Sequence, residues 1–353
     1  MTSPAYLDSP FLRACRREPV AHTPIWFMRQ AGRYMPEYRA IKERATFLEM
    51  CRTPDLAVEV TLQPIRALGV DAAILFSDIL ITLAAMGVTV DFNPGPHIPD
   101  PIRTRAQVDA LRTPKPEESV PFVLEALRRL RKELPAHIPL IGFCGAPWTL
   151  ACYATEGGGG KEPVRMKRLC YEDPTTAALL LDKLTDMNAA YLVAQIEAGA
   201  QAVQIFDTWA QLLHVADYDR WALPYVERMI KKVREATAAH SPAPVIIYFA
   251  RESGALLPHV AHATADVVSV DWRVPLDTAR RVLGGAIALQ GNLDPWALFA
   301  PWDELRRHAD EVLVRAGNQP GHIFNLGHGI LQETPVDNVR RLVEYVHERT
   351  AAR

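Results

Sequence analysis

The chain has 353 residues, of which 49% are hydrophobic and 23% charged, a composition typical of a globular protein that folds in water. Its formal net charge of −2 provides no overall attraction to nucleic acid or to an anionic membrane, so anion binding would need locally placed arginines. No apolar run reaches the roughly 18–20 residues of a membrane-spanning helix, and no leader-like segment is recognised at the start, so we expect a cytoplasmic protein. The five cysteines form no C-x-x-C pair, and we expect them to be reduced thiols.

Short apolar runs alternate with longer amphipathic stretches along most of the chain. Eight runs are predicted as strands: Pro24–Met28, Ala72–Phe76, Pro139–Phe143, Ala202–Phe206, Val245–Phe249, Asp266–Val270, Ala286–Gln290 and His322–Leu326. Helical patterns between them include Pro54–Leu68, Val120–Leu134, Thr175–Ala198 and Asp219–Ala239. Because parallel strands need a crossover between them, the alternation predicts an α/β fold, a (β/α)8 TIM barrel forming a single domain over residues 1–353. A doubly wound open sheet is the competing architecture, but no G-x-G-x-x-G follows the first strand.

The segment after the second strand is predicted to be an insertion. Gly87–Arg103 is rich in proline, and Val88, Val90 and Phe92 alternate with other residues along it. This pattern predicts an inserted hairpin and not a domain boundary.

Active sites of such barrels lie at the carboxyl ends of the strands. Polar residues and glycines follow most of the predicted strands: Arg29, Arg33, Ser77, Asp78, Gly145, Asp207, Thr208, Arg251, Glu252, Asp271, Gly291, Asn292, Gly327, His328 and Gly329. We therefore expect a polar site at one rim of the barrel.

Arg29 and Arg33 stand in a loop behind the first strand, separated by Gln30, Ala31 and Gly32. A guanidinium group presents a planar fork of donors that matches a carboxylate and keeps its charge. With the backbone N–H groups between them, the two arginines are candidates for carboxylate binding. The alternative is a pair of surface arginines in structural ion pairs.

Asp78 follows an apolar strand and precedes another apolar run, so its carboxylate requires a cationic or N–H-rich partner. It is predicted either to stabilise positive charge on a substrate or to cap the following helix. His328 stands between two glycines, which would let the backbone approach a ligand closely. Tyr153 lies on a helix that is expected to start near Pro147, and its position alone fits the hydrophobic core better than a catalytic role. Thr208 is predicted either to cap a helix or to donate its hydroxyl group to a ligand.

The sequence lacks the residue patterns that a phosphate-binding loop, a zinc site or a Schiff-base enzyme would require. The run Gly157–Gly160 resembles a phosphate loop, but it does not follow a strand directly and Glu162 stands where Ser or Thr is needed, so a loop or lid is expected. His259 and His262 have no third ligand at a recognisable spacing, so no metal site is expected. No lysine follows a predicted strand, which argues against a Schiff base, although Lys161 in the glycine run stays a candidate.

Six segments together resemble the uroporphyrinogen decarboxylase family of haem biosynthesis: Met28–Tyr38, Phe76–Leu80, Gly145–Leu150, Gln204–Trp209, Gln290–Pro295 and Phe324–Ile330. The resemblance covers essentially the whole chain. It implies a (β/α)8 fold, a cytosolic homodimer with facing clefts, and a carboxy-lyase without cofactor. The implied reaction removes the four acetate carboxyl groups of uroporphyrinogen III and yields coproporphyrinogen III.

The resemblance also implies roles for individual residues. Asp78 would meet the pyrrole N–H groups, and Arg29 and Arg33, helped by the backbone of residues 30–32, would hold substrate carboxylates. Tyr153 and His328 would contact the substrate, as would Thr208, where some members have Ser. An acetate on a pyrrole can lose its carboxyl group as CO2 after protonation of a ring carbon, because the resulting cation accepts the electron pair of the broken C–C bond.

In that chemistry Asp78 would stabilise the cation, and Arg29, or a group that it holds, would deliver the proton.

Two alternative functions for the protein remain. One is a corrinoid-linked methyltransferase of the same superfamily, which would need a His and Cys zinc site. The other is a tetrapyrrole-binding protein without catalytic activity.

Overall fold

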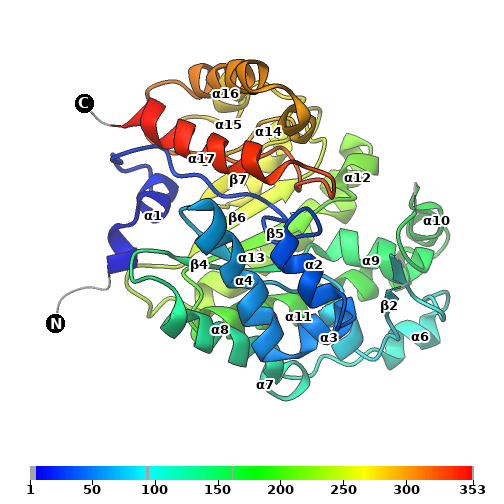
Figure 1. The fold of residues 1–353 in the computed structure, drawn as a ribbon. Helices are drawn as coiled ribbons and strands as arrows, with labels where there is room; N and C mark the ends of the chain where they lie inside the picture. Colours follow the sequence, from blue (N-terminus) through cyan, green and yellow to red (C-terminus); the bar gives the residue numbers. More distant parts are fainter. Residues whose placement is uncertain (1–4, 93–94, 161, 352–353) are drawn as a thin grey trace.

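A curled parallel sheet forms the centre of the molecule in the computed structural model, which describes residues 5–92, 95–160 and 162–351. Helices lie around the sheet (Figure 1). Its seven strands neighbour one another in the order β1 (Ala73–Ile74), β4 (Leu140–Gly145), β5 (Ala202–Asp207), β6 (Val245–Ala250), β7 (Val267–Ser269), β8 (Ala288–Gln290) and β9 (His322–Ile323). Every neighbouring pair is parallel, as the alternation of strands and helices predicted.

The first predicted strand, Pro24–Met28, lies between the two edge strands of this sheet. On one side the N–H of Phe324 donates to the carbonyl of Pro24 at 2.8 Å, and the N–H of Trp26 donates to the carbonyl of Phe324 at 3.3 Å. On the other side the N–H of Asp71 donates to the carbonyl of Ile25 at 2.8 Å. The segment is thus hydrogen-bonded to residues that adjoin both β9 and β1, although it forms a single bridge and not a full ladder.

The longer helices follow the predicted amphipathic stretches. The α-helices are α1 (Pro10–Cys15), α2 (Pro36–Lys42), α3 (Phe47–Arg52), α4 (Pro54–Leu68), α5 (Ile81–Ala85), α6 (Arg105–Ala110), α7 (Pro116–Ser119), α8 (Pro121–Glu133), α9 (Pro147–Glu156), α10 (Val164–Glu172), α11 (Pro174–Glu197), α12 (Val215–Trp221), α13 (Leu223–Ala236), α14 (Leu257–Val260), α15 (Leu276–Leu283), α16 (Trp302–Ala316) and α17 (Val336–Thr350). Helix α4 shows why they begin and end there. Pro54 starts it, where no N–H is needed, and Gly69 ends it in the left-handed conformation, at φ 72°.

The prediction of one continuous helix over Asp219–Ala239 is wrong. Helix α12 ends at Trp221 and α13 begins at Leu223, with Ala222 at φ −120° between them. Pro224 explains the break, because proline lacks the N–H of a helix interior but fits a first turn. The amphipathic pattern continues across this junction, so periodicity did not reveal the break.

Within the predicted insertion, β2 (Asp91–Phe92) pairs antiparallel with β3 (Pro96–His97). Residues 93 and 94 between them lie outside the described residues, and so does Lys161, so the inserted hairpin and the lysine candidate stay predictions. The glycine run is held to this segment, because the N–H of Ile98 donates to the carbonyl of Gly157 at 2.9 Å.

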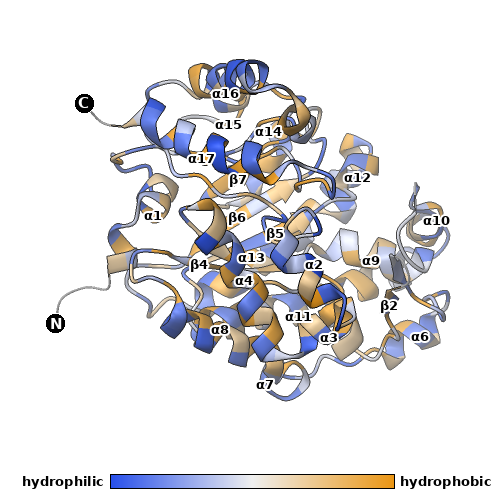
Figure 2. Ribbon diagram, in the orientation of Figure 1, coloured by the Kyte–Doolittle hydropathy of each residue, from blue (hydrophilic) through white to orange (hydrophobic). Residues whose placement is uncertain are grey.

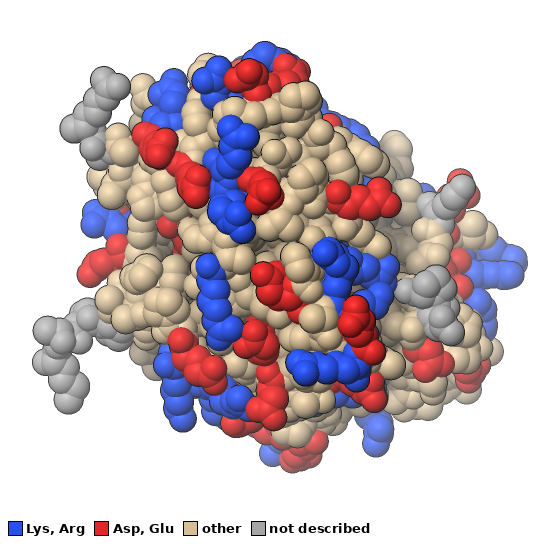
Figure 3. Space-filling model, viewed as in Figure 1, with Lys and Arg blue, Asp and Glu red and all other residues tan. Residues whose placement is uncertain are grey.

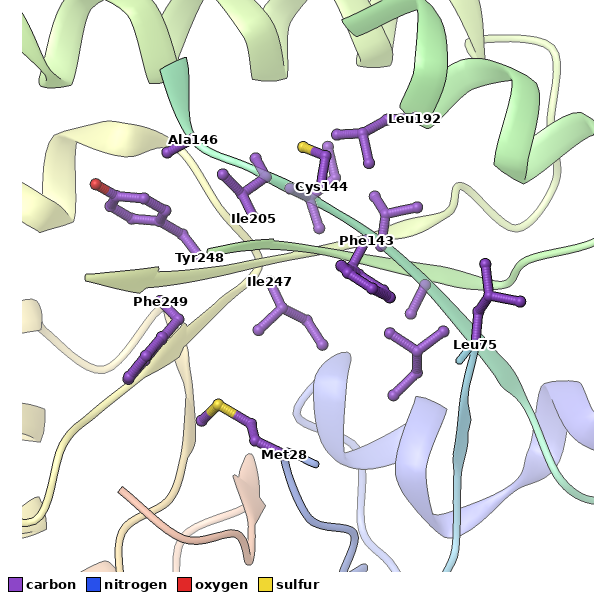
Figure 4. Packing of buried hydrophobic residues seen from close by; sticks show 14 of the residues in the cluster. Met28, Leu75, Phe143, Cys144, Ala146, Leu192, Ile205, Ile247, Tyr248 and Phe249 are labelled. Atoms are coloured by element: carbon purple, nitrogen blue, oxygen red, sulfur yellow. The ribbon is translucent and has the colours of Figure 1, made fainter. Parts of the chain in front are cut away.

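Apolar side chains fill the space inside the sheet and between the sheet and the helices. Strands β4 and β6 are buried along their whole length, and Figure 2 shows helices that are hydrophobic on one side only. Met28, Phe143 and Ile247 lie close to one another in the core (Figure 4). One hydrogen bond between buried polar groups ties the first segment to β8, because Trp26 Nε1 donates to Gln290 Oε1 at 2.9 Å.

The surface and the cysteines agree with the composition. Basic and acidic side chains are intermingled on the face shown in Figure 3. All five cysteines are buried and free. Among the helices of the described ranges, none combines the length and the apolar character that crossing a membrane requires.

Candidate active site

The carboxyl ends of the strands open into a cleft of about 1000 Å³. This is the upper end of the usual size range for ligand pockets. All nine side chains and backbone groups predicted for the site line it: Arg29, Gln30, Ala31, Gly32, Arg33, Asp78, Tyr153, Thr208 and His328. The structure therefore brings together residues that are up to 299 positions apart in the sequence.

Arg29 projects into the cleft from a strained backbone position. Its φ is 60°, in the left-handed region that residues other than glycine seldom adopt, and its side chain is exposed. Within the described part of the chain its guanidinium group makes no hydrogen bond or ion pair, whereas Arg33 donates from Nη1 to Gln332 Oε1 at 2.8 Å. Arg29 is thus available to a ligand, and Arg33 is held by a neutral partner that leaves its charge uncompensated.

The segment between the arginines contributes less backbone than predicted. The N–H of Gln30 already donates to the carbonyl of Phe27 at 3.0 Å. The Gln30 side chain is buried and donates from Nε2 to the carbonyl of Ala72 at 3.1 Å. Only Ala31 and Gly32 keep N–H groups without an acceptor among the residues described. Gln30 therefore holds the loop in place, and Ala31 and Gly32 are its two neighbours that line the cleft.

Asp78 lies between the strand β1 and the helix α5. Its Oδ1 accepts the N–H of Leu80 at 2.8 Å, and this local turn precedes the helix, whose cap position is Leu80. Burial raises the pKa of Asp78 to about 6, against the lowering effect of that hydrogen bond and of the Arg29 charge. The predicted cap role is therefore wrong: Asp78 closes a turn before the helix, and α5 has no side-chain cap hydrogen bond. The carboxylate still lines the cleft, and it is ionised at neutral pH.

His328 is neutral in this environment. Burial, together with the positive charges of Arg29, Arg251 and Arg273, lowers its pKa to about 3. Its ring lies 6.0 Å from that of Phe249, centroid to centroid. A neutral imidazole can donate one hydrogen bond and accept another, but it does not supply a positive charge. Binding of anionic groups in the cleft therefore depends on the arginines.

The glycines beside His328 make room for protein atoms. A Cβ on Gly329 would lie 2.7 Å from Cγ of Arg29, and a Cβ on Gly327 would lie 2.9 Å from the carbonyl carbon of Asp271. We expected these glycines to admit a ligand. They instead allow the Arg29 side chain and the loop after β7 to pack against the backbone on either side of the histidine.

Aromatic side chains form an apolar wall that the sequence analysis did not single out. The rings of Phe143 and Phe206 meet edge to face at 5.6 Å, and both line the cleft. Tyr153 packs edge to face on Trp209 at 5.4 Å, and burial raises its pKa. Tyr153 thus joins a core contact to the wall of the cleft. Strands β4 and β5 are buried along nearly their whole length, so alternation along the sequence gave no signal for these two residues.

Two other acidic residues at the strand ends, Asp207 and Asp271, bind neighbouring protein groups and do not line the cleft. Asp207 accepts from Thr149 Oγ1 at 2.6 Å and from Tyr248 OH at 2.9 Å. Asp271 accepts the N–H of Arg273 at 2.8 Å. Position at a strand end was therefore not sufficient to assign a residue to the site.

The cleft combines features that suit one kind of ligand. Four basic residues line it, Arg29, Arg33, Lys42 and Arg44, together with Glu43 and Glu49. The sequence analysis missed Lys42 and Arg44 because they lie at and just after the end of α2 and not at a strand end. A largely desolvated carboxylate, Asp78, stands deeper, between apolar walls. This arrangement suits a large, flat molecule with acidic groups at its edge and N–H donors or developing positive charge at its centre.

Comparison with known sequences agrees with the family resemblance noted in the sequence. The family model described as "Uroporphyrinogen decarboxylase (URO-D)" matches residues 7–349. The uroporphyrinogen decarboxylase of Roseiflexus sp. (strain RS-1) is 53% identical over 345 residues, which is 97% of this chain and 99% of that protein. The uroporphyrinogen decarboxylase of Carboxydothermus hydrogenoformans is 52% identical over 344 residues, covering 97% of both.

Solved structures with the same fold are more distant in sequence. A methyltransferase from Methanosarcina mazei superposes with a TM-score of 0.81 at 20% identity, over 98% of this chain and 99% of that one. A B12-independent methionine synthase from Shewanella superposes with a TM-score of 0.56 at 12% identity, over 84% and 88% of the two chains. At these identities the likeness concerns the fold alone.

Proposed function

Because the chain belongs to the uroporphyrinogen decarboxylase family, we propose that it is a carboxy-lyase that converts uroporphyrinogen III to coproporphyrinogen III. It removes the four acetate carboxyl groups as CO2. The observation that carries this proposal is the placement of Asp78, a desolvated carboxylate between apolar walls, in the cleft whose lining includes the exposed side chain of Arg29. The substrate has the complementary form, with pyrrole N–H groups at its centre and carboxylates at its edge.

The chemistry follows from this placement. A proton adds to a ring carbon of the pyrrole, and the resulting cation draws in the electron pair of the bond to the carboxylate, so that CO2 leaves. A second proton converts the exocyclic methylene to a methyl group, and the ring carbon gives its proton back. Each cycle thus consumes one proton net. The Asp78 carboxylate stabilises the cation, and it acts strongly because it is already desolvated and held by Leu80.

The other residues bind, orient and supply the proton. Arg29 and Arg33 hold carboxylates at the rim. Tyr153, Thr208 and the neutral His328 position the macrocycle. We assign proton delivery to a water molecule or substrate carboxyl group that Arg29 holds, since the guanidinium group itself is too weak an acid. His328 is unsuited to deliver the proton at neutral pH, because its pKa is lowered to about 3.

The methyltransferase alternative has no supporting donor set in the cleft. It would need thiolate and imidazole ligands for zinc side by side. None of the described residues that line the cleft is a cysteine, and all five cysteines are buried elsewhere. The alternative of a tetrapyrrole-binding protein without catalytic activity is distinguished from the enzyme by the assay described below.

We also infer the larger organisation of the protein. The seven-stranded sheet and the segment Pro24–Met28 together form one closed (β/α)8 barrel domain, which the hydrogen bonds on both sides of that segment support. We propose a cytoplasmic homodimer. Two neighbouring aromatic residues support an interface, because Trp296 is 65% exposed, Phe299 is 38% exposed, and their rings lie 5.7 Å apart.

The test of the proposed function is an anaerobic assay with uroporphyrinogen III on metal-free protein. The products are oxidised and separated by the number of their carboxyl groups. Stepwise appearance of products with seven to four carboxyl groups, without added cofactor, is the expected result. Binding of the substrate without release of CO2 would favour the binding protein, and neither binding nor turnover would exclude both.

A further inference from the structure

Three metal-ligating side chains converge at the end of the barrel opposite the cleft. His22 precedes the first segment of the sheet, Asp71 precedes β1, and His347 lies in the last turns of α17. Asp78 follows the same strand that Asp71 precedes, so the two carboxylates mark opposite ends of it. One ligand atom from each of the three residues lies within 4.8 Å of the others.

We propose that His22, Asp71 and His347 form a binding site for a divalent transition-metal ion of the Zn²⁺ type. His22 Nε2 lies 3.1 Å from Asp71 Oδ1, and His347 Nε2 lies 2.7 Å from Asp71 Oδ2. Ligand atoms that share one Zn²⁺ ion at about 2.0–2.1 Å lie roughly 3 Å from each other. The two distances to Asp71 are therefore close to those of an occupied site, and all three ligand atoms lie within 4.8 Å of one another.

The donor set determines the class of ion. Two imidazole nitrogens and one carboxylate oxygen suit Zn²⁺ and its first-row neighbours, whereas Mg²⁺ and Ca²⁺ prefer oxygen ligands alone. The side chains are 25%, 12% and 27% exposed for His22, Asp71 and His347, so the site is open to solvent on one side. Water molecules can complete the coordination there.

Neighbouring backbone holds the three ligands in place. The N–H of Ile25 donates to Asp71 Oδ2 at 2.7 Å, which fixes the carboxylate. The N–H of Thr23, next to His22, donates to Thr350 Oγ1 at 2.8 Å and so ties that segment to the helix that carries His347. Supporting hydrogen bonds of this kind orient ligands before the metal arrives.

An ion bound there would join three parts of the chain. It would link the first segment of the barrel, the start of β1 and the C-terminal helix α17. Both imidazoles must then carry their proton on Nδ1, so that Nε2 is free to bind the metal. Because the site lies at the opposite end of the strands from the cleft, we assign it a stabilising role and no part in decarboxylation.

The first test is metal binding by the whole protein. The chain is treated with a chelator, dialysed, and titrated with Zn²⁺ by calorimetry and with Co²⁺ by visible absorption. We expect one ion per chain and ligand-field bands from Co²⁺. The buried cysteines offer no competing site at the surface. Absence of saturable binding by either ion would overturn the proposal.

Variants then locate the ion. His22→Gln and His347→Gln, on two different segments, should each weaken Zn²⁺ binding at least tenfold and abolish the rise in Tm that Zn²⁺ produces. The matched control is His259→Gln, which removes another histidine hydrogen-bonded to a carboxylate, Asp219 at 2.7 Å, but outside this cluster. It should bind Zn²⁺ like the unaltered chain. Equal loss in all three variants, or in none, would contradict the proposed site.

Discussion

The side chain of Arg29 lies directly across the backbone of Gly329, where a Cβ would come within 2.7 Å of its Cγ. Arg29 itself is held at φ 60°. The first and last loops of the cleft are thus fitted to each other at these two residues. The direction of the Arg29 guanidinium group depends on the absence of one methyl group 300 positions later in the chain.

Gly329→Ala tests this relationship. The added Cβ should push the Arg29 side chain aside, and displacement of a positioning group can lower kcat/KM on the order of 10- to 100-fold. Stability should change little, because Gly329 has no positive φ and the atoms that must move belong to a flexible side chain. The control is Gly285→Ala, where nothing lies within 4 Å of the new Cβ. If the two variants show the same decarboxylation kinetics, Arg29 does not depend on Gly329.

Asp78→Asn tests the proposed cation stabiliser. Asparagine keeps an oxygen that can accept the N–H of Leu80, so the fold should persist, but it removes the negative charge. Loss of one such electrostatic contact typically costs about 10²- to 10³-fold in kcat. Asp294→Asn is the matched control, because Asp294 makes the same local bond to the N–H of Trp296 at 3.0 Å outside the cleft. Turnover of the Asp78 variant at the unaltered rate would remove Asp78 from the mechanism.

The pH dependence of kcat/KM should have an acid limb near pH 6. Burial raises the pKa of Asp78 to about 6, and only its ionised form stabilises a cation, so activity should fall as the pH drops through that value. His328 is already neutral there, because its pKa is lowered to about 3. His328→Gln should therefore keep the limb and Asp78→Asn should lose it. The opposite result would assign the titration to the histidine.

Arg33→Ala should weaken substrate capture. A charge-assisted hydrogen bond contributes about 1.5–3 kcal/mol, so kcat/KM should fall by about one to two powers of ten. Arg33→Lys should recover part of this loss, since it keeps the charge and lacks the planar fork. Arg66→Ala, which removes an exposed arginine paired with Glu59 on α4, serves as the control. Kinetics of Arg33→Ala that match the control would place Arg33 outside the binding site.

Asp207 should matter for stability. Asp207→Ala leaves the buried hydroxyl groups of Thr149 and Tyr248 without their acceptor, which should lower the free energy of unfolding by about 2–4 kcal/mol. Asp207→Asn should cost less than half as much, because it retains one acceptor and because burial already disfavours the charge, raising the pKa to about 6. Denaturant unfolding measures both. Equal losses would mean that the cavity, and not the hydrogen bonds, sets the cost.

The order of strands and helices could be predicted from the sequence because most strands are buried and form short, largely apolar runs. Ala202–Phe206 was predicted as a strand, and β5 covers Ala202–Asp207. The break between α12 and α13 was missed because Pro224 causes it, whereas the amphipathic pattern of the sequence continues across it. The pairing of Pro24–Met28 with Phe324 could not be read from local patterns, because it joins opposite ends of the chain.

The site could be predicted in part for a similar reason. Parallel strands bring their carboxyl ends to one edge, so Asp78, Thr208 and His328 had to lie near each other. What a strand end cannot show is the direction of the side chain. Asp78 and Asp207 both follow apolar strands, yet one lines the cleft and the other binds Thr149 and Tyr248. Only tertiary packing separates them.

The hydrogen bonds between Pro24–Met28 and Phe324 have a consequence for synthesis. The partner of the first segment is made 299 residues after Ile25, which at 5–20 residues per second means roughly 15 to 60 s on the ribosome. Until then Ile25, Trp26 and Phe27, all fully buried in the finished protein, have no final partner on that side. Nascent chains that stall before residue 324 will expose this apolar edge, and they are the form of this protein most in need of a chaperone.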